Sequence, residues 1–354
     1  MLLDKQEENL TKKAERCPYC QGSNIVKKGI RRKKLEEIQI YFCKNCGKKF
    51  VPQIAKNKTY PLRIILEALT LYNRLATLEQ ISQKIAEKYG LKINCQTVVN
   101  WVNCYKEQIP FLRFREFAAK KYAAKDMIEE VHLTHGQIYD FKYHRAKTEF
   151  LLNEDFKNYR LGRLKEFLEL VGQECPHTLF RESQRRASEY RNFFNIDQVK
   201  ITDRNNAAPK IVRLVMQAVA NNNLRHEVLQ EFMLANDSVT VAVEVPVLLE
   251  QDDILHFRNE LCWNVPIDLP LGEAITGHID IVQLRNGAIH IMDYKPSAKK
   301  VKPIDQLTLY ALALSRLTSI RLYYFKCAWF DEDNYFEFYP LHVVMKKKKK
   351  AKSP

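Results

Sequence analysis

Three residues in the C-terminal part of the chain have types and a spacing that suit metal-ion chemistry: Asp280, Asp293 and Lys295. Two apolar segments flank Asn286-Gly287, a dipeptide that tolerates positive φ and favours a two-residue β-hairpin turn. If the turn has no bulge, Asp280 lies directly opposite Asp293, with Cβ atoms about 4.5–5.5 Å apart, where like charges repel. A divalent cation offsets that repulsion because hard ions bind carboxylate oxygens. Lys295 points to the same face of the strand as Asp293, so the pattern predicts a metal site with an amine beside it.

Opposed carboxylates beside a lysine suit the hydrolysis of a phosphodiester. A metal ion orients and acidifies the attacking water, and positive charge stabilises the charge that develops on the phosphate. Lys295 then either holds the water or stabilises that charge. Whether a second metal ion takes part stays open. For either Asp alone, a solvated or turn-capping role is the more common one. The apolar neighbours of both acids, among them Ile279, Ile281 and Ile291, favour the metal site instead.

This stretch resembles the RecB-type exonuclease branch of the PD-(D/E)XK nucleases, which includes CRISPR-associated relatives. That branch has the motifs G-x-x-D, D/E-x-K and Q-x-x-x-Y, and the chain reads Gly277-x-x-Asp280, Asp293-Tyr294-Lys295 and Gln306-x-x-x-Tyr310. The resemblance implies an α/β (α+β) restriction-endonuclease-like core, in which a mixed sheet is flanked by helices. It also implies five catalytic residues: Asp280, Asp293, Lys295, Gln306 and Tyr310. Taken alone, Gln306 and Tyr310 would simply share one face of a packing helix.

The resemblance also implies how a catalytic metal is held. The family has a histidine on an upstream helix, and the segment LRHEVL at 224–229 resembles that element. His226, Asp280 and Asp293 are therefore the expected ligands of Mg²⁺ or Mn²⁺, with the backbone carbonyl of Tyr294 as an added oxygen. Without the resemblance, a lone helical histidine is more often structural. Glu244, in an apolar run, is a further candidate acid near the site.

Four cysteines near the N-terminus form two C-x-x-C pairs, Cys17 with Cys20 and Cys43 with Cys46, and 22 residues separate the pairs. Two-residue spacing lets both sulfurs of a pair bind one tetrahedral ion, so the pattern predicts a structural Zn²⁺ held by four thiolates. Redox or disulfide chemistry is the alternative, which the doubled motif disfavours. A closed site has no open position for substrate, so we expect it to stabilise a zinc ribbon. The remaining cysteines lack ligand spacing.

The next segment has the pattern of a helix-turn-helix. Pro61 suits a helix start, and apolar residues recur at helical spacing between 78 and 89. Gly90 is expected to end that second helix, and Asn94 to cap a third that runs to about 106.

The third of these helices is the expected DNA-reading element. Val98, Val99 and Val102 are predicted to pack inward. Five polar residues of the segment are left for a DNA groove: Gln96, Thr97, Asn100, Asn103 and Lys106. A generic helical hairpin is the alternative interpretation.

A zinc ribbon followed by a helix-turn-helix is similar to the N-terminal DNA-binding part of insertion-sequence transposases. In those proteins a ribonuclease-H-like domain with three scattered acids follows. Here residues 128–145 alternate like a hairpin around His135-Gly136, and Glu129 and Glu130 lie where an acid is expected, but there is no convincing set of three. The similarity covers roughly the first third of the chain. The region 146–222 is expected to be mainly helical, and Arg181, Arg185 and Arg186 in it are either contacts to nucleic acid or part of a solvated helix face.

Charge is distributed unevenly along the 354 residues. Residues 1–125 contain 26 Lys and Arg against 11 Asp and Glu, and six lysines lie at 346–350 and 352, whereas residues 126–345 contain 25 basic and 31 acidic residues. A basic N-terminal part is the expected electrostatic partner of phosphate backbones. There is no run of eighteen apolar residues and the N-terminus is polar, so we expect no membrane span, no signal peptide and a cytoplasmic location.

These patterns combine into one prediction of organisation and function. We expect five regions: a zinc ribbon at 1–56, a helix-turn-helix at 57–120, a hairpin and helical connection at 121–222, a PD-(D/E)XK nuclease core at 223–345 and a basic tail at 346–354. The predicted function is a metal-dependent DNA nuclease that the N-terminal module targets to DNA. A non-catalytic DNA-binding regulator and a transposase-related recombination protein are the alternatives. The oligomeric state stays open.

Overall fold

The computed structural model describes residues 16–32, 37–51, 59–135, 137–173, 185–190, 193–194, 199–219 and 224–345. The chain forms two compact units. Unit 1 comprises Met1–Ile109 and Ile211–Phe232, and unit 2 comprises Pro110–Lys210 and Met233–Pro354. The five regions predicted from the sequence stay a prediction. Arg181, Cys175 and the lysine-rich tail lie outside the described residues.

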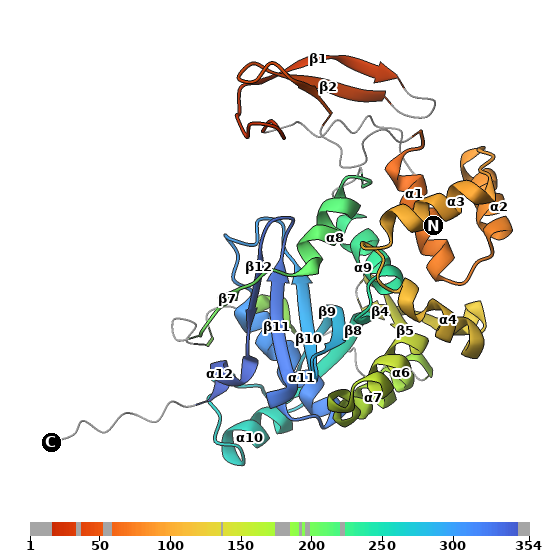
Figure 1. The fold of residues 1–354 in the computed structure, drawn as a ribbon. Coiled ribbons are helices and arrows are strands. Elements are labelled where there is room, and N and C mark those ends of the chain that lie inside the picture. The colour runs from red at the N-terminus through yellow and green to blue at the C-terminus, as the bar shows by residue number, and fades with distance from the viewer. Residues whose placement is uncertain are drawn as a thin grey trace. The chain divides into compact units, whose positions relative to one another are not determined.

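Unit 1 begins with a small antiparallel sheet (Figure 1). Its strands, in spatial order, are β1 (Ile25–Arg32), β2 (Glu37–Cys43) and β3 (Lys49–Phe50). The rings of Tyr41 and Phe50 stack with centroids 5.9 Å apart and pack with the buried Cys17 and Cys43. A core this small buries little apolar surface, so a metal cross-link is the expected source of its stability.

Three helices follow in unit 1, where the sequence predicts them: α1 (Leu62–Asn73), α2 (Leu78–Tyr89) and α3 (Cys95–Tyr105). Thr77 and Gln80 form a capping box at the start of α2, and Gly90 ends it with φ 65°. The Asn94 side chain accepts a hydrogen bond of 2.9 Å from the backbone N–H of Gln96. The predicted helices and caps are therefore confirmed.

The buried face of α3 differs from the prediction. Val98, Trp101 and Tyr105 are buried, whereas Val99 and Val102 are half-buried. Positions spaced three and four residues apart lie on one helix face, and two large aromatic side chains fill that face. The predicted inward packing is confirmed for Val98 and holds only in part for Val99 and Val102, and the prediction left out Trp101 and Tyr105.

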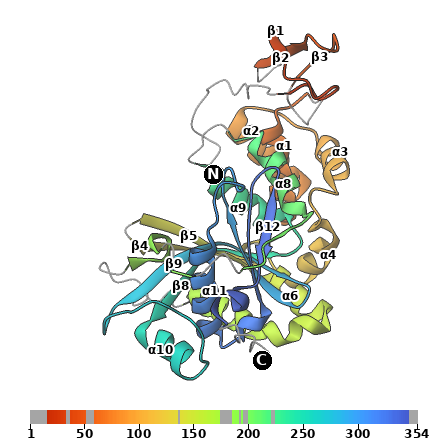
Figure 2. The ribbon, with the colours of Figure 1, turned by 90° about the vertical axis from the view of Figure 1, so that its left-hand side faces the viewer.

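Unit 2 is built on a mixed sheet with the strand order β4-β5-β8-β9-β10-β11-β12-β7, and β6 pairs with β9. The strands are β4 (Ile128–His135), β5 (Gln137–His144), β6 (Arg185–Arg186), β7 (Thr202–Asp203), β8 (Thr240–Glu250), β9 (Ala274–Arg285), β10 (Ala288–Tyr294), β11 (Phe325–Phe330) and β12 (Tyr335–Phe338). The pairs β10–β11 and β6–β9 are parallel, and the other pairs are antiparallel. Figure 2 shows β4 and β5 at one edge of the sheet.

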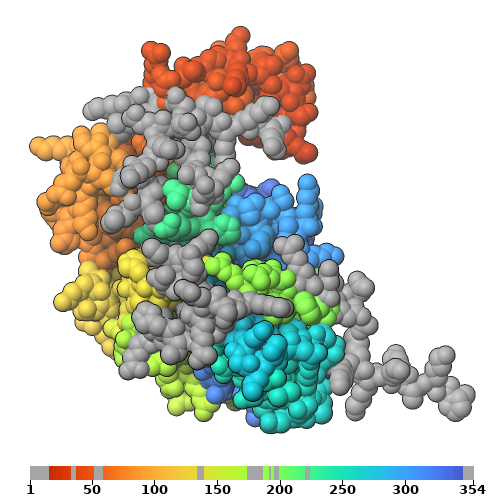
Figure 3. Space-filling view, turned by 180° about the vertical axis from the view of Figure 1, so that it is seen from behind, coloured from red at the N-terminus to blue at the C-terminus, as the bar shows by residue number. Residues whose placement is uncertain are grey.

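Helices flank this sheet, as predicted. Because parallel strands need a crossover, α11 (Ile304–Thr318) connects β10 to β11 and packs against β8 and β11. Helix α10 (Gln251–Asn259) lies on the surface and is visible from behind in Figure 3. The remaining α-helices among the described residues are α4 (Leu112–Lys121), α5 (Ala124–Met127), α6 (Arg145–Glu154), α7 (Gly162–Gln173), α8 (Ala207–Met216), α9 (Arg225–Asn236) and α12 (Pro340–Val344).

The predicted hairpin at 128–145 is present as β4 and β5. Its two glutamates have structural partners. Glu129 lies 2.6 Å from the Arg145 guanidinium, and Glu130 lies 2.9 Å from Lys142 Nζ. In the part of the chain that the structure describes, no helix has both the length and the apolar character to cross a membrane.

A fully buried lysine in unit 2 makes a testable contribution to stability. Lys147 Nζ donates a hydrogen bond to the Leu234 carbonyl and lies 5.1 Å from the centre of the Phe111 ring. Burial lowers the pKa of Lys147 from 10.5 to about 7, and the charge of Asp237 opposes that shift. The unfolded chain therefore binds this proton more tightly, so the free energy of unfolding should rise between pH 7 and 10, by up to about 1.4 kcal/mol per pH unit.

Lys147→Met tests this expectation, because methionine keeps the apolar stem and removes the titrating amine. The variant loses the donor to Leu234 at every pH, so only the pH dependence is diagnostic. Urea unfolding at pH 7, 8 and 9 should show a smaller rise in the free energy of unfolding for the variant than for the wild type. Parallel profiles would contradict the role of Lys147.

Candidate active site and metal centre

The β9–β10 hairpin has the predicted turn and register. Asn286 and Gly287 both have positive φ, 54° and 69°, as a type I′ turn requires. The paired residues run from Arg285 with Ala288 to Ile281 with Met292 without a bulge. One step further along the same register, Asp280 and Asp293 are side by side.

A third acid lies on the neighbouring strand β8. Val243 pairs with Ile281 and Val245 pairs with Ile279, so Glu244 is at the level of Asp280. Glu244 has φ 51°, which is rare for a residue with a side chain inside a strand and is typically retained at functional sites. Three acids on three adjacent strands therefore lie at one level of the sheet.

Asp293 is the most deeply buried of these acids. Burial raises its pKa well above the ordinary value, and the neighbouring charge of Asp280 raises it further, whereas Lys295 lowers it. Lys295 Nζ lies 2.8 Å from Asp293 Oδ2. Burial alone would lower the pKa of Lys295, but the charges of Asp293 and Asp280 raise it overall. At neutral pH, Lys295 is thus a cation beside two competing carboxyl groups.

These residues fit a divalent cation. Both carboxylate oxygens of Asp293 are buried; Oδ2 pairs with Lys295, whereas Oδ1 has no hydrogen-bond partner among the described residues. A buried carboxylate oxygen without a partner is costly, and one lysine beside two acids leaves negative charge that a further cation would offset. Mg²⁺ or Mn²⁺ between Asp280 and Asp293 would supply oxygen-preferring positive charge at this position.

Two residues of α11 contact each other, and one of them, Tyr310, lies close to the acids. Gln306 Nε2 donates a hydrogen bond of 3.0 Å to Tyr310 Oη, as their spacing of four residues allows. Burial raises the pKa of Tyr310, and the charges of Asp280 and Asp293 contribute to the rise. Tyr310 is therefore a neutral phenol at physiological pH, held beside the acids.

Gly277 makes room for that phenol. A Cβ atom at position 277 would lie 2.3 Å from Tyr310 Cε1 and 3.0 Å from Tyr310 Oη. Gly277→Ala should therefore displace Tyr310, break its contact with Gln306, and lower the phosphodiester cleavage that the sequence predicts for this site by on the order of 10²-fold.

The matched control for this substitution is Gly162→Ala, because a Cβ at Gly162 meets nothing within 4 Å. Initial cleavage rates and circular dichroism of both variants check the expectation. A Gly277→Ala protein that cleaves like Gly162→Ala would show that the position of Tyr310 is unimportant.

An aromatic and basic group borders the acids on the β5 side. The rings of Tyr139 and His278 stack with centroids 3.6 Å apart and an interplanar angle of 11°. The Arg186 guanidinium lies 6.0 Å from the centre of the Tyr139 ring. Burial raises the pKa of Tyr139, Arg186 lowers it, and the charge of Glu244 raises it, which places these residues near one another.

Tyr139 and His278 were not predicted from the sequence as site residues. Glu244 was a candidate acid, and Arg186 was a candidate contact to nucleic acid on a helix, whereas it lies on the strand β6. The isolated acid in the apolar β8 segment was the one signal available. The stacking of Tyr139 on His278 leaves no recognisable pattern in the sequence, because the two residues are 139 positions apart.

The predicted histidine ligand belongs to unit 1, whereas the acids belong to unit 2. His226 is on α9, in the part of that helix that belongs to unit 1, and is half-buried. Its role as a ligand of the catalytic metal stays a prediction.

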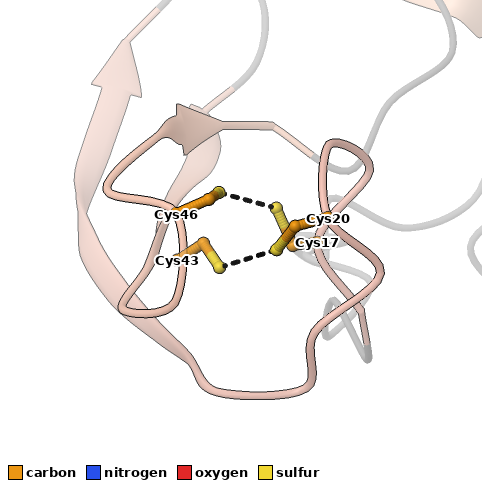
Figure 4. Close-up of side chains that lie close together, drawn as sticks. All are labelled: Cys17, Cys20, Cys43 and Cys46. Carbon is orange, nitrogen blue, oxygen red and sulfur yellow. Dashed lines mark hydrogen bonds between the residues drawn. The ribbon is translucent and has the colours of Figure 1, made fainter.

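The four N-terminal cysteines lie together, as Figure 4 shows. Cys17 Sγ is 3.6 Å from Cys46 Sγ, and Cys20 Sγ is 3.5 Å from Cys43 Sγ. All four sulfurs lie within 4.8 Å of one another. Four thiols that converge in this way from two loops fit a tetrahedral Zn²⁺ with no open position, so this cluster is a candidate structural metal site.

Most of the predicted DNA-binding residues of α3 are accessible. Thr97 is half-buried, and the other four are exposed: Gln96, Asn100, Asn103 and Lys106. Gln96 Nε2 donates a hydrogen bond of 3.2 Å to Asn100 Oδ1, so these two side-chain amides lie together on the exposed surface of the helix.

Comparison with known proteins agrees with the geometry of unit 2. Residues 164–332 match the family model described as the PD-(D/E)XK nuclease superfamily, and these residues form a domain of that superfamily. The matched segment includes the five catalytic candidates of the sequence analysis. Neither curated proteins nor solved structures gave a match.

Proposed function

We propose that this protein is a RecB-type, metal-dependent DNA nuclease that its N-terminal region delivers to DNA. The observation that carries the proposal is the buried contact between Asp280, Asp293 and Lys295 on the β9–β10 hairpin. A PD-(D/E)XK superfamily domain around that contact supports it. The intact acids and lysine count against a non-catalytic regulator that only keeps the fold.

Each residue of the site has a role in this proposal. Asp280 and Asp293 would hold Mg²⁺ or Mn²⁺, with Glu244 as a further oxygen donor. The bound cation supplies Lewis-acid activation of water and neutralisation of the phosphate. Lys295, as a cation beside Asp293, would donate hydrogen bonds to the water or to the phosphate oxygens.

The residues around the acids would position the substrate. Tyr310, as a neutral phenol, would donate to a phosphate oxygen while Gln306 donates to its Oη. Arg186 would bind phosphate by charge, and the stacked pair of Tyr139 and His278 offers an aromatic surface beside the acids.

The test is a metal-titrated digest of labelled single- and double-stranded DNA by the full chain. We expect no cleavage without divalent ions. With Mg²⁺ or Mn²⁺ we expect shorter DNA products whose new ends come from hydrolysed phosphodiester bonds. The size of the first products separates exonucleolytic from endonucleolytic cutting. Absence of cleavage under all metals would favour the non-catalytic regulator, and joined products would favour a recombination protein.

DNA targeting is a second element of the proposal, supported by the exposed polar face of α3 and the basic excess of residues 1–125. Asn100→Ala with Asn103→Ala should weaken binding to duplex DNA without changing the folded content of the protein. Equal affinity of this variant and the wild type in an anisotropy titration would remove α3 from the DNA interface.

A further inference from the structure

Three large aromatic side chains of unit 2 lie almost fully in solvent. The exposed fractions are 86% for Phe156, 78% for Tyr159 and 69% for Tyr323. A single exposed aromatic residue is ordinary, but several together are typical of a binding surface.

The three side chains come from two short turns that touch each other. Phe156 and Tyr159 lie on the 3₁₀ turn η1 (Phe156–Leu161), and Tyr323 lies on η6 (Leu322–Tyr324). Arg160 Nη1 donates a hydrogen bond of 3.0 Å to Tyr324 Oη, and the rings of Tyr323 and Tyr324 have centroids 5.3 Å apart. The exposed rings therefore belong to one surface, which we call the η1–η6 surface and define by the side chains of Phe156, Lys157, Tyr159, Arg160, Arg163, Arg321, Tyr323 and Tyr324.

The backbone that carries these rings is anchored. The buried Asn158 side chain donates a hydrogen bond of 2.9 Å to the Leu151 carbonyl and accepts one of 3.1 Å from Gly287 N–H. Asp155 caps the turn by accepting a hydrogen bond of 2.9 Å from the Lys157 N–H. Phe156 and Tyr159 are thus held out in solvent by a fixed turn, which lowers the entropy cost of binding a partner on them.

The charge of the η1–η6 surface is positive, although its surroundings are acidic. Its cations are Lys157, Arg160, Arg163 and Arg321, and the nearest acid along the chain, Asp155, is half-buried and caps the turn. Residues 126–345 as a whole have 25 basic and 31 acidic residues. Exposed aromatic rings among cations suit a partner that presents both flat apolar faces and negative charge.

We propose that the η1–η6 surface binds single-stranded nucleic acid. Bases stack on Phe156, Tyr159 and Tyr323, and the arginines and Lys157 bind the phosphates between them. Stacking of this kind accepts any base, because every base has a π-face, and requires a single strand, because a duplex hides those faces. The inference rests on the proposed nuclease function and specifies the form of its substrate.

This surface is distinct from the metal site. Asn158 contacts the β9–β10 turn at Gly287, whereas Asp293 lies at the other end of β10, six residues and about 20 Å away along the strand. A single strand of nucleic acid that occupied both the η1–η6 surface and the metal site would be held by its bases on that surface, while a phosphodiester further along it reached Asp293.

The experiment compares the wild type with the triple variant Phe156→Ala, Tyr159→Ala, Tyr323→Ala. The full chain is titrated without Mg²⁺ against a fluorescein-labelled 20-nucleotide oligothymidylate and against a 20-base-pair duplex, with anisotropy as the readout. We expect the triple variant to bind the oligothymidylate at least 10-fold more weakly and the duplex within 2-fold of the wild type. The matched control is Leu271→Ala, since Leu271 is 89% exposed and lies outside this surface.

A second variant tests the cations. Lys157→Gln with Arg321→Gln removes two exposed charges, so the slope of log affinity for oligothymidylate against log salt should become shallower by about 1.4. An unchanged slope would show that phosphates do not bind here.

Besides an unchanged salt slope, three results with the triple variant would overturn the proposal: unchanged binding of the oligothymidylate, equal weakening for the single strand and the duplex, or conversion of a wild-type oligomer into a monomer. The last would make this surface an interface between copies of the chain. The two proposals can fail separately. Binding to the η1–η6 surface is measured without Mg²⁺ and without cleavage, whereas the nuclease assignment is tested by the cleavage rates of the catalytic variants.

Discussion

Asp293→Asn is expected to lower metal-dependent DNA cleavage by on the order of 10³-fold or more. Loss of one preorganised charged or hydrogen-bonding group from an active site costs about 10²–10³ in rate, and Asp293 is also a proposed ligand of the metal. Asparagine has nearly the same volume, so the packing around residue 293 should be kept. Initial rates on labelled DNA with Mg²⁺ measure the effect, and Lys295→Met should behave similarly.

The same substitution should stabilise the metal-free protein. Because the pKa of Asp293 is raised in the folded state, its carboxylate costs stability as the pH rises above the unfolded value of 3.8, and that cost is fully present once the folded pKa is passed. The neutral amide of the variant removes this cost, so the metal-free melting temperature should rise at neutral pH. Mg²⁺ should raise the melting temperature of the wild type and leave that of Asp293→Asn unchanged.

A matched substitution separates catalysis from folding. Asp268→Asn makes the same chemical change at an exposed position, where the carboxylate pairs with Arg258 at 2.6 Å, and it should cleave DNA normally. Cleavage by Asp293→Asn at the rate of Asp268→Asn would refute the assignment of the active site.

Cys43→Ser is expected to remove the N-terminal metal and unfold the ribbon. Structural zinc supplies about 10–16 kcal/mol in small zinc modules, and the apolar core here consists of a few side chains around Tyr41 and Phe50. The purified wild type should contain one Zn²⁺ per chain by elemental analysis, and Cys43→Ser close to none. Limited proteolysis should then cut the variant within residues 16–51.

Cys104→Ser is the matched control, because Cys104 is exposed and is not part of the four-sulfur cluster. It should retain the zinc and resist the protease. A Cys43→Ser protein with full zinc content would show that the four sulfurs do not form the metal site.

The local geometry of the candidate site was predictable from the sequence. Asn286-Gly287 determines the turn, the turn determines the register of β9 against β10, and the register brings Asp280 beside Asp293. Hairpins can be predicted in this way because a two-residue turn leaves one register. The cysteine pairs are predictable for a similar reason, since ligand spacing within a knuckle is local.

Contacts between distant segments could not be predicted in this way. Glu244 reaches the level of Asp280 only because β8 pairs with β9, and the inward face of α3 depends on where Trp101 and Tyr105 find space. The sequence alone suggested both glutamates of β4 as candidate acids, whereas the fold pairs them with Arg145 and Lys142.

The sequence by itself thus determined the hairpin acids, the lysine and the cysteine pairs, because each depends on backbone geometry over a few residues. Only the tertiary structure decided that Tyr310 fills the space left by Gly277, that Tyr139 stacks on His278, and that two separate turns form the η1–η6 surface. Such contacts depend on how whole helices and strands pack, which the spacing of residues over a short stretch of sequence does not predict.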